Sequence, residues 1–219
     1  MVTVSPETAR AVRGGATREL LLGTAERLFA ERGVFAVSNR KVSAAAGQAN
    51  NAAVGYHVGT KTDLVRAIAH RRNEEIEQLR RQIVGDLGGS ADLRDWIACL
   101  VRPITDHLAA LGHPSWFARF RAQVMTDPEL RKIMIGEALT APSLQRVLDG
   151  LNRCLPDLPE DVYRERWDMS RQLIEHMCAE RERALAEGAP TTRVSWHATA
   201  TGLIDALVGI WLSPVTPDR

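Results

Sequence analysis

Apolar residues recur at helical spacing along most of the chain, and glycines and prolines divide it into segments of helix length. No stretch alternates apolar and polar residues strictly enough to predict a strand, and neither a repeat nor a low-complexity tract is present. We therefore predict an all-α fold of roughly nine or ten helices. The predicted helices cover residues 18–32, 39–46, 51–58, 60–87, 93–111, 115–126, 128–139, 142–154, 160–187 and 192–212.

The N-terminal residues and one proline lead to two further predictions. Residues 1–16 are polar and contain adjacent glycines, which predicts a flexible arm carrying Arg10 and Arg13. Pro103 lies inside a predicted helix, and we expect it to kink that helix or to mark a join between two helices.

The composition is that of a soluble globular protein, because 45% hydrophobic and 25% charged residues exclude a disordered chain. Cys99, Cys154 and Cys178 are too few and too far apart for a disulfide framework or a CxxC zinc site. We expect a reducing, cytoplasmic location and no membrane partner. Neither a signal peptide nor an apolar run long enough to span a bilayer is visible.

Charge is distributed unevenly, although the net charge of the whole chain is only +1. Residues 1–82 carry a net charge of +5, and residues 83–219 carry a net charge of −4. A basic first third suggests that this end meets a polyanion, although a solvated basic face would have the same composition.

No pattern in the sequence predicts catalysis. The HExxH, GxSxG, P-loop and GxGxxG motifs are absent, and no Glu precedes a His by three residues as di-iron sites require. The six histidines are scattered, and solvated or hydrogen-bonded roles explain them as well as ligation does. We expect no enzymatic activity, no cofactor and no metal site.

The segment 38–61 predicts a helix-turn-helix, which is a short helix, a turn and a second short helix. Gly47 can adopt the positive φ of the turn, and the small Ala45 and Ala46 let the two helices cross closely. An ordinary helical corner is the alternative. The outer face of the second helix carries groups that can hydrogen-bond to bases or phosphates, namely Asn50, Asn51, Tyr56 and His57.

Three stretches resemble the DNA-binding region of TetR-family transcriptional regulators. Residues 21–33 (LLGTAERLFAERG) resemble the first helix of that family, and residues 42–47 (VSAAAG) resemble its second helix and turn. Residues 56–64 (YHVGTKTDL) resemble the block that opens the following helix. The resemblance covers about residues 17–65.

This resemblance implies a domain organisation and a set of DNA contacts. Residues 1–62 would bind DNA, residues 63–219 would bind an effector and dimerise, and a helix at about 60–87 would link them. The turn after Gly47 is one residue longer than the common pattern, so either Asn50 or Asn51 can be the amide that faces the groove. The implied contacts to phosphates and bases are Ser38, Arg40, Asn50, Asn51, Ala52, Tyr56, His57, Thr60 and Lys61.

The resemblance also implies an effector pocket among the middle helices, where tryptophan, phenylalanine and methionine are concentrated. Such side chains line apolar cavities well, although each of them can equally be plain core. No charge cluster occurs beyond Gly88, which favours a small, largely apolar effector. The predicted lining is Trp96, Leu100, Trp116, Phe117, Phe120, Met134 and Trp167, with Arg119, Arg121, His107 and His176 as candidate polar anchors.

The last predicted helix is apolar nearly all round and rich in small residues, so it must be buried on most sides. Packing of this helix and helix 160–187 against the same two helices of a second chain would form a four-helix interface. The alternative is a central core helix of a monomer. The predicted interface residues are Met169, Leu173, Met177, Ile204, Val208, Gly209 and Trp211.

Together these features predict a bacterial, homodimeric repressor that binds an inverted-repeat operator in double-stranded DNA and is released by its effector. Three alternatives stay open at this point: a regulator without an effector, an activator, and a helical enzyme or binding protein in which 38–61 is only structural.

Overall fold

The computed structural model describes the backbone of residues 6–216 and the side chains from Gly14 to Thr216. These residues form ten α-helices and no strand, which confirms the all-α prediction. The helices are α1 (Pro6–Arg32), α2 (Asn39–Ala45), α3 (Ala53–His57), α4 (Lys61–Leu87), α5 (Leu93–Leu111), α6 (Phe117–Val124), α7 (Pro128–Leu139), α8 (Pro142–Cys154), α9 (Glu160–Ala186) and α10 (Trp196–Leu212).

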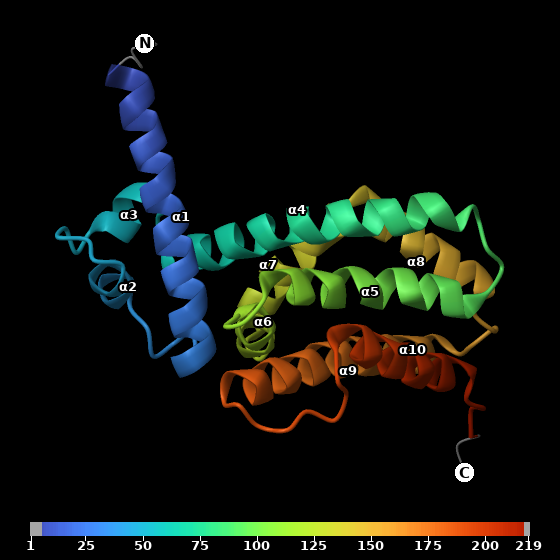
Figure 1. The fold of residues 1–219 in the computed structure, drawn as a ribbon. Helices are drawn as coiled ribbons and strands as arrows, with labels where there is room; N and C mark the ends of the chain where they lie inside the picture. The colour runs from blue at the N-terminus through green and yellow to red at the C-terminus, as the bar shows by residue number, and fades with distance from the viewer. Residues whose placement is uncertain (1–5, 217–219) are drawn as a thin grey trace.

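The N-terminal helices form a unit at one end of an elongated helical body (Figure 1). α1 stands across this end, and α2 and α3 pack against its side. α4 leaves the unit and runs along the body, where it packs against α5, α7 and α8. α9 and α10 lie on the side of α5 away from α4, and α6 packs against both α1 and α9.

α1 is longer than predicted, because residues 6–16 continue it instead of forming a flexible arm. Gly14 and Gly15 lie inside this helix at a cost of about 1 kcal/mol each. Alanine neighbours, which have the highest helix propensity, and a proline at the first helical position favour the helix nevertheless. The side chains of Arg10 and Arg13 lie outside the described part of the chain.

The later helices follow the glycine and proline signals closely. The predicted starts of α7 at Pro128 and of α8 at Pro142 are confirmed. α5 runs unbroken through Pro103, so this proline does not divide the segment into two helices. α10 begins at Trp196, later than predicted, because Ser195 Oγ accepts a hydrogen bond from Ala198 N–H at 3.0 Å and caps it there.

One continuous hydrophobic core joins the N-terminal unit to the body. Phe29 of α1 stacks on Phe120 of α6 with 6.2 Å between ring centroids, and neither side chain is exposed. The same core extends through α5 to Trp211 of α10. None of the helices in the described residues is both long and apolar enough to cross a bilayer.

Candidate nucleic-acid interface and ligand cavity

The first helix of the candidate interface, α2, is capped by Ser38. Ser38 Oγ accepts a hydrogen bond from Lys41 N–H at 3.2 Å, as an N-cap residue does. Lys41 Nζ donates to the Ala36 carbonyl at 2.9 Å. The exposed Arg40 side chain makes no hydrogen bond or ion pair within the described chain, so it is the cation of α2 that is available to an anion.

A buried hydrogen bond fixes α3 on α2. Ser43 Oγ, with no exposed surface, accepts from Val54 N–H at 3.2 Å and satisfies a donor that the start of the short α3 would leave free. Gly47 has a φ of +68°, as the turn prediction requires. Of the two alanines expected at the helix crossing, Ala46 is buried and Ala45 is exposed. In the sequence, the only sign of this hydrogen bond is a serine, Ser43, at a position of α2 that faces the interior.

The turn before α3 distinguishes Asn50 from Asn51. Asn50 Oδ1 accepts a hydrogen bond from Ala52 N–H at 2.9 Å, so this side chain closes the turn. The exposed Asn51 side chain forms no hydrogen bond with any described residue. Since the turn occupies these positions, α3 starts at Ala53, later than predicted, and Asn51 is the amide left free.

The outward face of α3 carries an aromatic pair. Tyr56 is 77% exposed, and its ring meets that of His57 edge to face with 4.8 Å between centroids. His57 is half-buried. Because so exposed an aromatic side chain adds little packing within the chain, its hydroxyl is available to an external partner.

Thr60 and Asp63 form a capping box at the start of α4. Thr60 Oγ1 accepts from Asp63 N–H at 3.1 Å, and Asp63 Oδ2 accepts from Thr60 N–H at 2.9 Å. Hydrogen bonds that the Thr60 backbone N–H and the Thr60 hydroxyl donate to Asp63 Oδ2, together with the charge of Arg66, hold the pKa of Asp63 below its usual value. The neighbouring Gly59 has a φ of +118°, and a Cβ there would lie 2.7 Å from Asp63 Oδ2.

Lys61 is tied back to the loop that follows α1. Its Nζ donates to the Val34 carbonyl at 3.0 Å and lies 6.0 Å from the centre of the Phe35 ring. The ammonium retains two further N–H donors. Lys61 therefore links α4 to the end of α1 in addition to being near the interface.

A cavity of about 370 Å³ lies in the body, among α5, α6, α7, α8 and α9. Its volume falls in the range of small-molecule sites. Of the predicted lining residues, Leu100, Met134 and Trp167 do line it. Most of the remaining wall is apolar and comes from α7, α8 and the middle of α9.

The other predicted lining residues lie elsewhere. Trp96 is buried against Gly150, where a Cβ would come within 2.3 Å of the indole, and its Nε1 donates to the Ser90 carbonyl at 2.8 Å. Phe117 and Phe120 belong to the solid core between α1, α5 and α6. Trp116 precedes α6 and lines a surface depression between α1 and α4 instead.

The polar wall of the cavity is centred on Glu175, which is 4% exposed. Its carboxylate accepts from Arg121 Nη2 at 3.2 Å and from Arg171 Nη1 at 3.3 Å. At the other end of the cavity, the Tyr163 hydroxyl donates to Asn152 Oδ1 at 2.6 Å. Among the candidate polar anchors only Arg121 lines this cavity.

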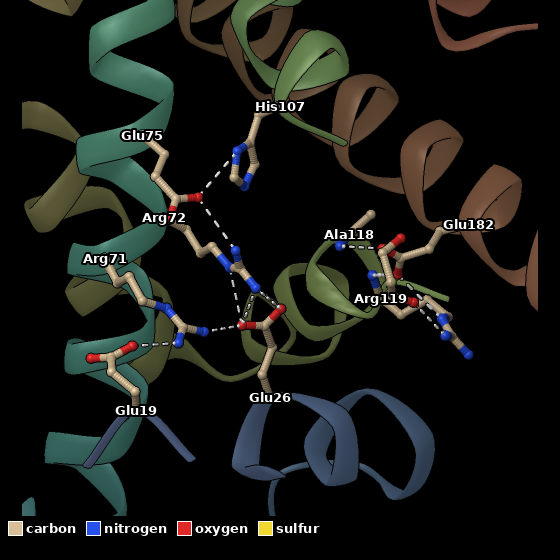
Figure 2. Close-up of polar contacts among 10 residues, drawn as sticks. Glu19, Glu26, Arg71, Arg72, Glu75, His107, Ala118, Arg119 and Glu182 are labelled. Carbon is tan, nitrogen blue, oxygen red and sulfur yellow. Dashed lines mark hydrogen bonds and ion pairs between the residues drawn. The ribbon is translucent and has the colours of Figure 1, made fainter. Parts of the chain in front are cut away.

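A buried ion-pair network joins the N-terminal unit to the body (Figure 2). Glu26 of α1, 1% exposed, accepts from Arg71 Nη2 at 2.7 Å and from Arg72 Nη2 at 2.9 Å. Burial alone would lower the pKa of Arg72, but the charges of Glu26 and Glu75 raise it above its ordinary value. Glu75 Oε2 also lies 3.4 Å from Nδ1 of His107 on α5.

His107 is neutral at neutral pH despite this carboxylate neighbour. Burial lowers its pKa to about 4, and the positive charges of Arg72, Arg121 and Arg71 act in the same direction. The candidate anchor Arg119 is likewise used within the chain. Arg119 and the backbone N–H of Ala118 both donate to Glu182 of α9, and these bonds tie α6 to α9 (Figure 2). His176 is exposed on α9.

The predicted dimer residues divide between an outer face and the core. Met169 and Met177 of α9 are 45% and 44% exposed, and Gly209 of α10 is exposed. Ile204 and Trp211 are buried within the chain, because α10 packs on α5 and the Trp211 ring lies against Tyr163 and Trp167 of α9. Leu173 and Val208 are half-buried.

The described residues contain no cluster of His, Cys, Asp or Glu side chains that could hold a metal ion. A comparison with protein-family models matches residues 98–209, just over half of the chain, to the model described as "Tetracyclin repressor-like, C-terminal domain". The comparison with curated proteins gives no match.

A comparison with solved structures matches two proteins over most of their length. One is a protein of Mesorhizobium loti assigned to the TetR family of transcriptional regulators. It has 13% identity and a TM-score of 0.49, over 90% of this chain and 98% of that one. The other is the TetR-family transcriptional regulator PfmR from Thermus thermophilus. It has 15% identity and a TM-score of 0.49, over 99% of this chain and 100% of that one.

Proposed function

Since the chain belongs to the TetR family of transcriptional regulators, we propose that it is a repressor that binds an inverted-repeat operator as a homodimer and leaves it when a small effector binds. Family membership makes it a DNA-binding regulator and not an enzyme. The observation that carries the proposal is the Ser43–Val54 hydrogen bond, which holds α3 rigidly on α2 with its polar face outward.

Within this proposal, residues 1–62 read the DNA. Exposed Asn51 and the neighbouring Ala52 face bases, because an amide can form two hydrogen bonds to adenine. Asn50 supports the turn through its bond to Ala52 N–H. The remaining predicted residues position the duplex through phosphates or base edges, namely Ser38, Arg40, Tyr56, His57, Thr60 and Lys61.

Residues 63–219 dimerise and bind the effector. The exposed Met177 of α9 lines a groove of about 430 Å³ between α9 and α10, together with Leu173, Gly202 and Ala206. The exposed Met169 lines a separate hollow between the start of α9 and the end of α10. A second copy related by a two-fold axis would cover this face, since isologous interfaces pair the same surface on both chains. Two α3 helices related by that axis would read an inverted repeat.

The effector acts from the cavity through two routes to α1. Arg121 and Met125 line the cavity from α6, and the same helix stacks Phe120 on Phe29 of α1. The cavity helix α7 packs on α4, which holds α1 through the Arg72–Glu26 pair. An effector that binds the DNA-free arrangement more tightly therefore lowers the affinity of the protein for its operator. Bound operator DNA lowers the affinity for the effector by the same factor.

The proposal is tested by sequencing genomic DNA that the purified wild-type protein retains, with an Arg40→Ala/Asn51→Ala double variant as control. Recovery of an inverted repeat by the wild type alone supports the proposal, and binding to it should weaken steeply with salt. Retention of the same fragments by both proteins would place the DNA contact elsewhere, and retention of none would contradict DNA recognition.

A further inference from the structure

Arg121 and Arg171 place guanidinium donors at the polar end of the effector cavity. Both oxygens of Glu175 are taken, one by Arg121 Nη2 and the other by Arg171 Nη1. Arg121 lines the cavity with a side chain that is 19% exposed, and its Nη1 makes no hydrogen bond in the described part of the chain. A ligand that brings an acceptor to Nη1 would form a charge-assisted hydrogen bond there.

Arginine side chains are concentrated at this end. Arg80 of α4 is 5% exposed, and burial, with like charge from Arg121, lowers its pKa to about 10. Its carboxylate partner, Glu77, is 3.6 Å away and also accepts hydrogen bonds from the N-terminus of α8. Three guanidinium groups thus meet two buried carboxylates and the exposed Asp168, so each acid at this end already has a cationic partner.

The cavity is long compared with its volume. Its wall on α9 extends from Tyr163 to Glu175, which is about 18 Å at the rise of an α-helix. A volume of about 370 Å³ over that length leaves a narrow channel. Ile135 and Leu139 of α7 are 36% and 43% exposed and mark its mouth, whereas the charged end at Glu175 is buried.

We infer that the effector is an elongated amphipathic carboxylate, with its head group accepting hydrogen bonds from Arg121 at the deep end and its apolar body lying along α7 and α9. This inference rests on the proposed effector site, and it names the chemistry of the molecule that fills it. A neutral head group would give Arg121 a weaker hydrogen bond than a carboxylate does, and an ammonium head group would be repelled by the guanidinium groups.

The test compares three probes with the same straight apolar chain, decanoate, methyl decanoate and decylamine, by calorimetric titration of the full-length protein without DNA. We expect decanoate to bind about tenfold or more tighter than the ester, because a charge-assisted hydrogen bond to Arg121 is gained. The amine should bind most weakly. Equal affinities, or a preference for the ester or the amine, would overturn the inference.

Variants locate the head group. Arg121→Gln/Glu175→Gln removes both members of the pair, so no buried charge is left alone, and it should abolish the preference for decanoate while leaving ester binding intact. Arg146→Gln, an exposed arginine on α8, is the control and should keep the preference. A preference that survives the double change would place the head group elsewhere and contradict the inference.

The inference and the proposed function fail in different ways. If decanoate binds with the expected preference but leaves DNA affinity unchanged, the inference about the cavity stands and the effector-linked release is wrong. If none of the probes binds while operator DNA is bound normally, the inference is wrong and DNA recognition stands.

Discussion

Arg72 of α4 holds the buried carboxylate of Glu26 on α1 through both oxygens, at distances between 2.9 and 3.1 Å. α1 belongs to the N-terminal unit, and α4 runs along the body that contains the cavity (Figure 1). The pair therefore ties the candidate DNA-binding unit to the helix that leads to the candidate effector cavity.

Replacing Glu26 with Gln should destabilise the protein by about 3–5 kcal/mol, because two guanidinium groups lose a buried counter-charge. Urea denaturation followed by circular dichroism measures this change. Glu31→Gln on the same helix breaks only the exposed pair with Arg27 and should cost under about 1 kcal/mol. Equal effects of the two changes would show that the buried network adds nothing beyond a surface ion pair.

The pH dependence of stability should report His107. Its pKa is lowered to about 4 from an ordinary 6.5, so the unfolded chain takes up a proton at a higher pH than the native chain does. The free energy of unfolding should therefore fall as pH drops from about 6.5 to about 4, by up to about 1.4 kcal/mol per pH unit from this group.

His107→Gln should remove that component of the slope, whereas His176→Gln, at an exposed position on α9, should not. Urea unfolding at several pH values in this window compares the three proteins. If the free energies of unfolding of the wild type and of His107→Gln depend on pH in the same way, the imidazole of His107 has the same pKa in the folded and unfolded chains, which would contradict the prediction.

Asn51→Ala should relax sequence preference at one or two base pairs, at a cost of about 1–3 kcal/mol for each preferred base. Asn50→Ala should instead weaken binding to all sequences alike, because it removes the bond that closes the turn before α3. Competition binding with single-base operator variants separates the two effects. The reverse pattern would assign base reading to Asn50.

Gly209→Asp should give monomers, because it places a charge on the exposed face of α10 that we propose to be covered by a second chain. A side chain at this position meets no atom of its own chain within 4 Å, so the fold itself should tolerate it. Gly136→Asp on α7 is an equally open helical control. Light scattering that shows an unchanged dimer for Gly209→Asp would move the interface away from this face.

Helix boundaries were largely predictable, because the sequence marks them with local chemistry. Pro128 and Pro142 start helices, Gly88 adopts the left-handed conformation that ends α4, and Thr60 with Asp63 forms a capping box. The start of α1 was not predictable in this way, because the alanines around Gly14 and Gly15 outweigh signals that usually end a helix.

The interior was harder to predict, since burial depends on which helices meet. Trp96, Phe117 and Phe120 have the composition of a pocket lining, yet contacts with α8 and α1 place them in solid core. Two interactions join residues that lie in different helices. They are the hydrogen bond between Ser43 and Val54 and the ion pair of Arg72 with Glu26. Only the folded arrangement brings such partners together.

The central claim is that two copies of the α2–α3 face read one inverted repeat. The most direct measurement is a hydroxyl-radical footprint of the wild-type protein on the genomic fragment that it retains. We predict protection of two inverted half-sites whose centres lie about 34–36 Å apart, one helical turn, or somewhat more. A single asymmetric block of protection, or uniform cleavage along the fragment, would contradict the account.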